Sequence, residues 1–250
     1  MSVNLIPAII LGVYLTVWTI LSPRLYRRYK EAAAQGHDFY NAFNLAAKQV
    51  LGNKAGDFFS KEISMIFYSL LRWKKVPITE SDYTYHKKSG ITTIWVFILF
   101  LVIAETVAVH FLLGLWSPIA AWILTVLSIY GGVQILGISK SMKQRPIKVK
   151  DDHLYVRYGI LKEATVPLTQ IESFEKNTKP VEDAALEEYA TLSPLYGMEG
   201  SNVRIAFREP VTLKMLYGKK EVPGVALYID EVDDFVKTLD EQLAPQAEEA

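Results

Sequence analysis

The residue best suited to chemistry in this 250-residue chain is Glu105, which stands alone in a long apolar stretch. Residues 89–139 contain no other formally charged side chain. A lone carboxylate at mid-bilayer costs several kcal/mol, so it should be neutral, paired or beside water. Counting outward from a turn at Trp116-Ser117 places three hydroxyl groups level with Glu105 or within one turn of it: Ser128, Thr125 and Tyr130. We expect a protonated Glu105 bonded to one of these hydroxyls. The alternatives are a proton or ion step, or a polar contact with another membrane subunit.

The remaining reactive side chains do not form a catalytic or metal-binding motif. His110 lies five residues beyond Glu105 and so about 140° around a helix, at the height of Trp122. The four histidines are far apart, and neither H-E-x-x-H, G-x-S-x-G, a P-loop nor G-x-G-x-x-G occurs. The absence of cysteine excludes disulfide scaffolds, Cys-ligated zinc and thiol nucleophiles. The sequence therefore predicts no enzyme, metal, cofactor or small-molecule substrate.

Three apolar segments predict membrane-spanning helices. The 51 residues between Lys88 and Lys140 suit two spans of ~20 residues joined by a turn, Ile91–Leu115 and Pro118–Ile138. The first 23 residues are also uncharged, and Val3–Leu21 predicts the first span. A cleaved signal peptide fits this segment poorly, because a basic n-region is missing and arginines follow the apolar run.

The basic residues near the predicted spans all fall on one side of the membrane. They follow the first span, precede the second and follow the third: Arg24, Arg27, Arg28 and Lys30; Lys74, Lys75, Lys87 and Lys88; Lys140, Lys143, Arg145 and Lys148. Because basic residues mark the cytoplasmic side, we expect a protein of the plasma (inner) membrane. Its N-terminus should lie outside, and everything from Gln144 onward should be cytoplasmic.

Residues 22–90 form a basic segment between the first two spans, with 12 basic and 6 acidic side chains. Glu62–Trp73 and Phe39–Leu51 each carry apolar residues at helical spacing. Helices lying on the inner leaflet fit this pattern, and so do helices packed against the C-terminal domain. The candidate lipid-contacting cations are Arg24, Arg27, Arg28, Lys30, Arg72, Lys74 and Lys75. Nucleic acid is a weaker candidate, because the charges are scattered and membrane spans flank them.

Residues 144–245 change to short alternating strands, followed by a tail at 246–250. A helix with a buried face of Val232, Phe235, Val236, Leu239 and Leu243 closes the series. Seven strands followed by one amphipathic helix is the order of a pleckstrin-homology-like (PH-like) barrel. The predicted strands are Ile147–Lys150, Leu154–Tyr158, Ala164–Leu168, Ile171–Lys176, Val203–Phe207, Leu213–Tyr217 and Val222–Ile229.

Four short motifs of this region resemble the PH-like domains of small bacterial membrane proteins: Asp152–Leu161, Val166–Ile171, Asn202–Ile205 and Asp233–Val236. The likeness covers about residues 144–245 and consists of strand and turn chemistry. It implies an α+β membrane protein with three transmembrane helices and a cytoplasmic PH-like β-barrel closed by the C-terminal helix. It carries no active site.

The 25 residues between Lys176 and Asn202 are too long for a hairpin turn. Within this insertion, residues 177–201, a short acidic helix is expected over Val181–Tyr189. It is either surface decoration or a docking element. The candidate partner surface is Glu182, Asp183, Glu187, Glu188, Leu195 and Tyr196.

Charge is segregated along the chain. Residues 1–143 hold 14 Lys/Arg and 7 Asp/Glu, whereas residues 144–250 hold 13 and 20. An acidic domain is a poor reader of phosphoinositides, so protein–protein contact is the better expectation for it. The sequence predicts a non-catalytic accessory or scaffold subunit that contacts lipid and binds another membrane protein or a second copy. An ion- or proton-coupled transport component using Glu105, a lipid-sensing regulator and a membrane enzyme without a recognised motif are the alternatives.

Overall fold

The computed structural model describes residues 5–74, 76–176, 189–192 and 201–247, of which residues 5–17 and 244–247 are described by their backbone alone. The chain forms two compact units, Met1–Ser64 and Met65–Ala250. The predicted acidic helix up to Glu188 and the six candidate partner-surface residues (Glu182, Asp183, Glu187, Glu188, Leu195 and Tyr196) lie outside the described residues, as does Lys75.

The first unit consists of helices α1 (Leu5–Ala34) and α2 (Phe39–Leu51) and most of α3 (Asn53–Ile66). Asp38 begins α2, because its carboxylate accepts the Asn41 amide at 3.0 Å, and Gly52 ends the helix at a φ of 83°. The apolar face of α2 packs against α1 and α3, in a cluster of Leu25, Tyr29, Phe43, Ala46, Ala47, Val50 and Phe59. This face was predicted to meet lipid or the C-terminal domain. Its described partners are the neighbouring helices.

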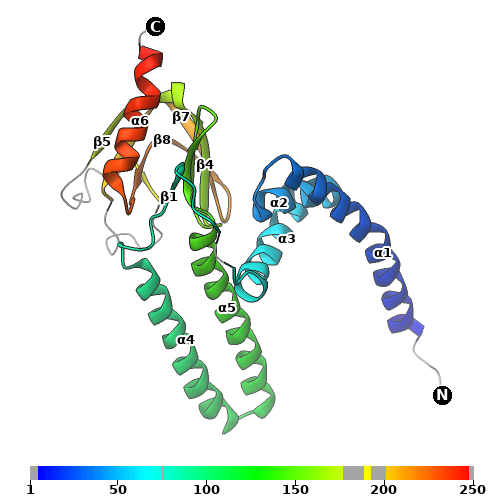
Figure 1. Ribbon diagram of the computed structural model, residues 1–250. Helices are drawn as coiled ribbons and strands as arrows, with labels where there is room; N and C mark the ends of the chain where they lie inside the picture. The colour runs from blue at the N-terminus through cyan, green and yellow to red at the C-terminus, as the bar shows by residue number, and fades with distance from the viewer. Residues whose placement is uncertain (1–4, 75, 177–188, 193–200, 248–250) are drawn as a thin grey trace. The chain divides into compact units, whose positions relative to one another are not determined.

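Two helices of the second unit, α4 (Ile91–Gly114) and α5 (Pro118–Gln144), are long and apolar enough to cross a membrane. They pack side by side as a hairpin (Figure 1). Ser117 caps α5 and Pro118 occupies its first turn, as expected of a helix start. Prediction and structure agree within one residue for α4 and at the start of α5. The prediction ended α5 at Ile138, whereas the helix continues through Lys140 to Gln144. The end of an apolar stretch does not end a helix that continues to pack against protein.

The predicted first span, Val3–Leu21, falls within α1 from Leu5 onward, but side chains up to Val17 lie outside the described part. The backbone stays helical past the predicted end and through the basic residues to Ala34, with Pro23 inside the helix.

The rest of the second unit is an open mixed sheet with one helix, which makes the chain an α+β protein. Hydrogen-bonded neighbours follow the order β1-β2-β3-β4-β7-β8-β6, and β5 pairs with β7. The elements after the hairpin are β2 (Ile147–Lys150), β3 (His153–Tyr158), β4 (Lys162–Pro167), β5 (Ile171–Lys176), β6 (Ala190–Thr191), β7 (Val203–Met215), β8 (Lys219–Leu227) and α6 (Val232–Ala247).

The predicted strands Val203–Phe207 and Leu213–Tyr217, the second as far as Met215, belong to the single 13-residue strand β7. The pairing with β8 shifts register between Ala206 and Val211, where three exposed residues intervene. Such a bulge lets one strand bend and continue. The interrupted apolar alternation was therefore read as a turn where the structure has a bulge.

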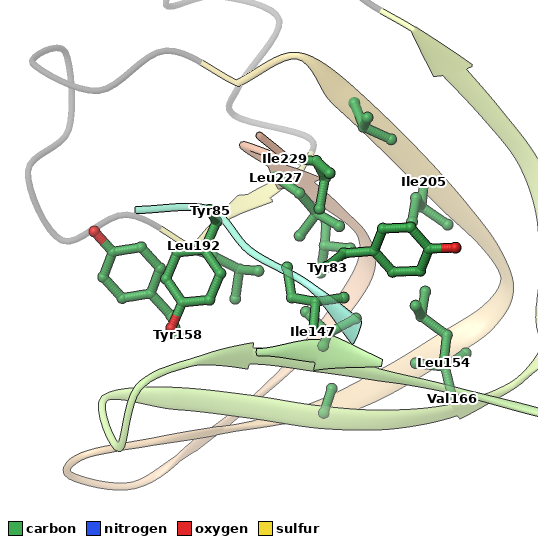
Figure 2. Packing of buried hydrophobic residues seen from close by; sticks show 14 of the residues in the cluster. Tyr83, Tyr85, Ile147, Leu154, Tyr158, Val166, Leu192, Ile205, Leu227 and Ile229 are labelled. Carbon is green, nitrogen blue, oxygen red and sulfur yellow. The ribbon is translucent and has the colours of Figure 1, made fainter. Parts of the chain in front are cut away.

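One strand of the sheet comes from before the hairpin. The strand β1 (Asp82–Tyr83) pairs antiparallel with β2, placing Asp82 opposite Lys148 and Tyr83 opposite Ile147. Tyr83 and Tyr85 are 5% and 1% exposed and lie among the core side chains of the sheet (Figure 2). The sheet domain was predicted to begin at residue 144. In the structure it also includes residues 82–85, so the hairpin is an insertion between its first two strands.

Candidate functional site

Glu105 lies on the outer face of the α4–α5 hairpin. Its side chain is exposed, and it has no hydrogen bond or ion pair within the described part of the chain. The groove between the two helices, of about 350 Å³, is instead lined by Thr106, Thr125 and Ser128. The expected hydrogen bond from Glu105 to Ser128, Thr125 or Tyr130 is absent from the described residues. Counting residues along an antiparallel hairpin gives the height of a side chain but not its direction around the helix.

His110 makes a polar contact between the two helices of the hairpin. Its Nδ1 atom lies 2.7 Å from the Thr125 hydroxyl, and its ring stands edge-on to Trp122 at 5.1 Å between centroids. The predicted height of His110 beside Trp122 agrees with this geometry. The Thr125 hydroxyl also donates to the Ala121 carbonyl at 2.9 Å. The contacts of His110 with Thr125 and Trp122 join α4 to α5 near their turn, whereas Glu105 is exposed.

The sheet end of α5 is fixed by a buried ion pair. Arg145, directly after the helix, is 1% exposed, and its Nη2 atom lies 2.6 Å from Glu163 on β4. The same guanidinium donates to the Gly159 carbonyl, while the Gly159 amide donates to the Tyr85 hydroxyl at 2.7 Å. Burial alone would raise the pKa of Glu163. The positive charges of Arg145 and Lys214 outweigh this effect and lower the pKa to about 2. Arg145 was predicted to mark the cytoplasmic side, together with Lys140, Lys143 and Lys148. In the structure it is a core residue that joins hairpin and sheet.

The start of α4 is fixed to the same domain by Asp230. This carboxylate, 6% exposed, accepts the backbone amide of Lys87 at 3.0 Å and that of Lys88 at 2.7 Å. Trp95 on α4 and Ile138 on α5 also pack against the core of the sheet domain. Both helices of the hairpin are therefore anchored in the sheet domain by buried polar groups and by a shared apolar core. From its place before the last helix, Asp230 or Glu231 could serve as a helix cap, but the bonds of Asp230 to the segment before α4 could not be read from local spacing.

A short π-helical segment, η1 (Phe67–Leu71), packs against the sheet end of α5. The crossing is close: a Cβ atom on Gly137 would lie 2.3 Å from the Met65 carbonyl oxygen. Tyr68 and Ser69 are buried, whereas Leu70 and Leu71 are 51% and 71% exposed. The apolar stripe predicted for Glu62–Trp73 thus ends on an exposed face, although the continuous α-helix predicted there gives way to a π-helix at Phe67.

Four basic side chains gather around η1 and the end of α5. The Lys140 ammonium donates to the Ser69 carbonyl at 2.9 Å and stands 3.2 Å from the centroid of the Trp73 ring. Gln144 bridges the two segments, donating to the Lys74 carbonyl at 2.8 Å and accepting from Arg72 at 3.4 Å. We call Arg72, Lys74, Lys140 and Lys143 the cationic corner. Within the described ranges none of the four forms a salt bridge.

The sheet domain carries a surface groove of about 610 Å³ between β5 and α6. Figure 1 shows β5 at one side of the sheet with α6 across it. Half-buried Phe174, Val236 and Leu243 form its apolar part. Among the described strands β5 pairs only with β7, so its other edge has no strand beside it. The sequence predicted β5 residue for residue but not its free edge, because strand order depends on long-range pairing.

The predicted cations after the first span lie on the exposed part of α1, where Arg27 and Arg28 pair with Glu31. Arg24 and Lys30 are exposed on the same helix. The structure brings Arg72 and Lys74 together with the end of α5, a grouping that no local pattern could predict.

Compared with protein-family models, with curated proteins and with solved structures, the chain gives no match.

Proposed function

We propose that this chain is a non-catalytic, membrane-anchored accessory subunit that holds its sheet domain at the inner face of the membrane for contact with another protein. The observation that carries the proposal is the double attachment of the α4–α5 hairpin. Arg145–Glu163 fixes its end and Asp230 fixes its start, so the domain has a set height and orientation rather than hanging on a linker.

The height of the domain follows from helix geometry. Lys140 lies 22 residues after Pro118, which is about 33 Å along a helix, against a hydrocarbon core of ~30 Å. Arg145, five residues further, is already buried in the sheet domain. A hairpin spanning the membrane therefore places the domain directly on its surface.

The groove between β5 and α6 supports a protein as the partner. An edge strand offers unpaired backbone groups, and an extended peptide segment can add beside it and place alternate side chains into a neighbouring groove. The apolar floor made by Phe174, Val236 and Leu243 suits such side chains.

We extend the proposal to the finer architecture: three spans with the N-terminus outside, and a PH-like fold for the sheet domain. The basic residues at the span ends support the orientation. Two observations support the fold: meandering antiparallel strands β2, β3 and β4, and α6 after the last strand.

Site-specific photocrosslinking of the full chain in native membranes tests this function. A photoreactive residue at Glu172 or Asp240, which line the groove, should give a discrete adduct, and the same residue at exposed Lys219 should not. Val236→Asp should abolish the adduct, whereas Lys237→Asp, on the exposed side of α6, should preserve it. An absence of adducts from the groove, or equal adducts from Lys219, would contradict the proposal.

A further inference from the structure

The strongest remaining feature is the cationic corner, because its position and surroundings match a lipid headgroup. Its members come from two segments far apart in sequence, and the packing of η1 on α5 brings them together. Lys74 and Lys143 are exposed and form no side-chain hydrogen bond or ion pair within the described ranges. The corner therefore has a concentrated positive charge that no described carboxylate neutralises.

The corner also lies where a headgroup would be. Lys140 is about 33 Å along α5 from Pro118, at the end of the helix farthest from the sheet domain, which is slightly more than the ~30 Å hydrocarbon thickness. Leu70, Leu71 and Trp73 beside it are 51%, 71% and 71% exposed. Exposed aliphatic side chains suit acyl chains, and a tryptophan suits the interfacial layer.

We propose that the cationic corner binds the headgroup phosphate of an anionic glycerophospholipid in the leaflet on the sheet-domain side. Arg72, Lys74 and Lys143 supply the charge. Lys140, held over Trp73 and bonded to Ser69, fixes η1 to α5 and sets the spacing of the other three. Leu70 and Leu71 contact the acyl chains. This inference requires the hairpin to span the membrane and is independent of any protein partner.

The test is lipid titration of the full chain, purified in an uncharged detergent, by native mass spectrometry. Dioleoylphosphatidylglycerol should bind more tightly than dioleoylphosphatidylcholine, whose choline cancels the phosphate charge. At roughly fivefold per basic residue, Lys74→Gln with Lys143→Gln should weaken phosphatidylglycerol binding about 30-fold. The matched control Lys219→Gln with Lys220→Gln removes the same charge from the sheet domain and should leave binding unchanged. Melting in the same detergent verifies that each variant is folded.

Two further measurements define the site. Quenching by dibrominated phosphatidylglycerol should fall in Trp73→Phe, since Trp73 lies beside the bound lipid. Glycerol 1-phosphate at millimolar concentration should not compete, because it lacks the acyl chains. Equal affinity of Lys74→Gln/Lys143→Gln and the unmodified chain would overturn the proposal, as would equal weakening by the control pair. Full competition by glycerol 1-phosphate would assign the corner to a soluble phosphate compound instead.

Discussion

Replacing Glu163 by Gln should detach the end of α5 from the sheet domain. The substitution keeps the size of the side chain but leaves the guanidinium of Arg145, 1% exposed, without its counter-charge. Folding lowers the pKa of Glu163 from 4.5 to about 2. At about 1.4 kcal/mol per pH unit, this difference corresponds to about 3 kcal/mol of stability at neutral pH. Breaking a buried pair by removing one partner costs ~3–5 kcal/mol, which agrees with that figure.

Hydrogen exchange of the full chain in detergent measures this loss locally. A cost of about 3 kcal/mol should speed the exchange of β3 and β4 amides about 150-fold. Glu175→Gln, on the exposed face of β5, is the matched control and should change exchange little. The reasoning is refuted if Glu163→Gln and Glu175→Gln exchange at similar rates.

The same pair sets a pH dependence. Because folding lowers the pKa of Glu163, its contribution is complete above pH 4.5 and is lost as pH falls towards 2. The unmodified chain should therefore lose protection of β3 and β4 across that range. The same loss in Glu163→Gln would show that another group is responsible.

Three further variants probe the other contacts. Gly137→Ala places a Cβ atom 2.3 Å from the Met65 carbonyl oxygen and should destabilise the packing of η1 by ~1–3 kcal/mol, which should lower the melting temperature. Gly131→Ala is the control, because the space around Gly131 is open. Asp230→Ala removes the acceptor of the Lys87 amide and should cost ~1–3 kcal/mol, with faster exchange at the start of α4; unchanged exchange there would contradict the anchoring role. Glu105→Leu should preserve or raise the stability of the hairpin in detergent, because the Glu105 carboxylate has no hydrogen-bond or ion-pair partner among the described residues. A marked drop in stability would contradict this and show that the carboxylate has a partner.

The α4–α5 hairpin was predictable because hydropathy and length act locally. The sequence Trp116-Ser117-Pro118 also predicts the turn between the two helices, and the structure has a turn at the same position. The boundaries of α2, β2 and β5 agree residue for residue with the prediction, and α2 and β2 are each followed by a capping or turn residue. Where a segment is bounded by its own chemistry, sequence reading suffices.

The site residues depended on pairings that local patterns do not contain. Glu105 is exposed and does not line the groove that contains Thr125 and Ser128, because helix rotation is set by packing against α5. Nothing in the local sequence around Arg145 indicates that it is buried. Its partner Glu163 is on β4, and only the tertiary structure shows that β4 lies beside Arg145. The two residues of β1 are too few for alternation to reveal a strand. The cationic corner needs the crossing of η1 over α5, which depends on Gly137 and a carbonyl far away in sequence.

The insertion of the hairpin between β1 and β2 has a consequence for biosynthesis. The emerging chain delivers Asp82 and Tyr83 to the ribosome exit before the hairpin, and their strand partners only after it. The sheet can therefore close only after the whole hairpin has been synthesised, so a misplaced hairpin also leaves an unfinished core. A soluble fragment starting after the hairpin would lack Tyr83 and Tyr85, whereas splicing residues 80–89 to 145–247 through a short glycine linker would restore them.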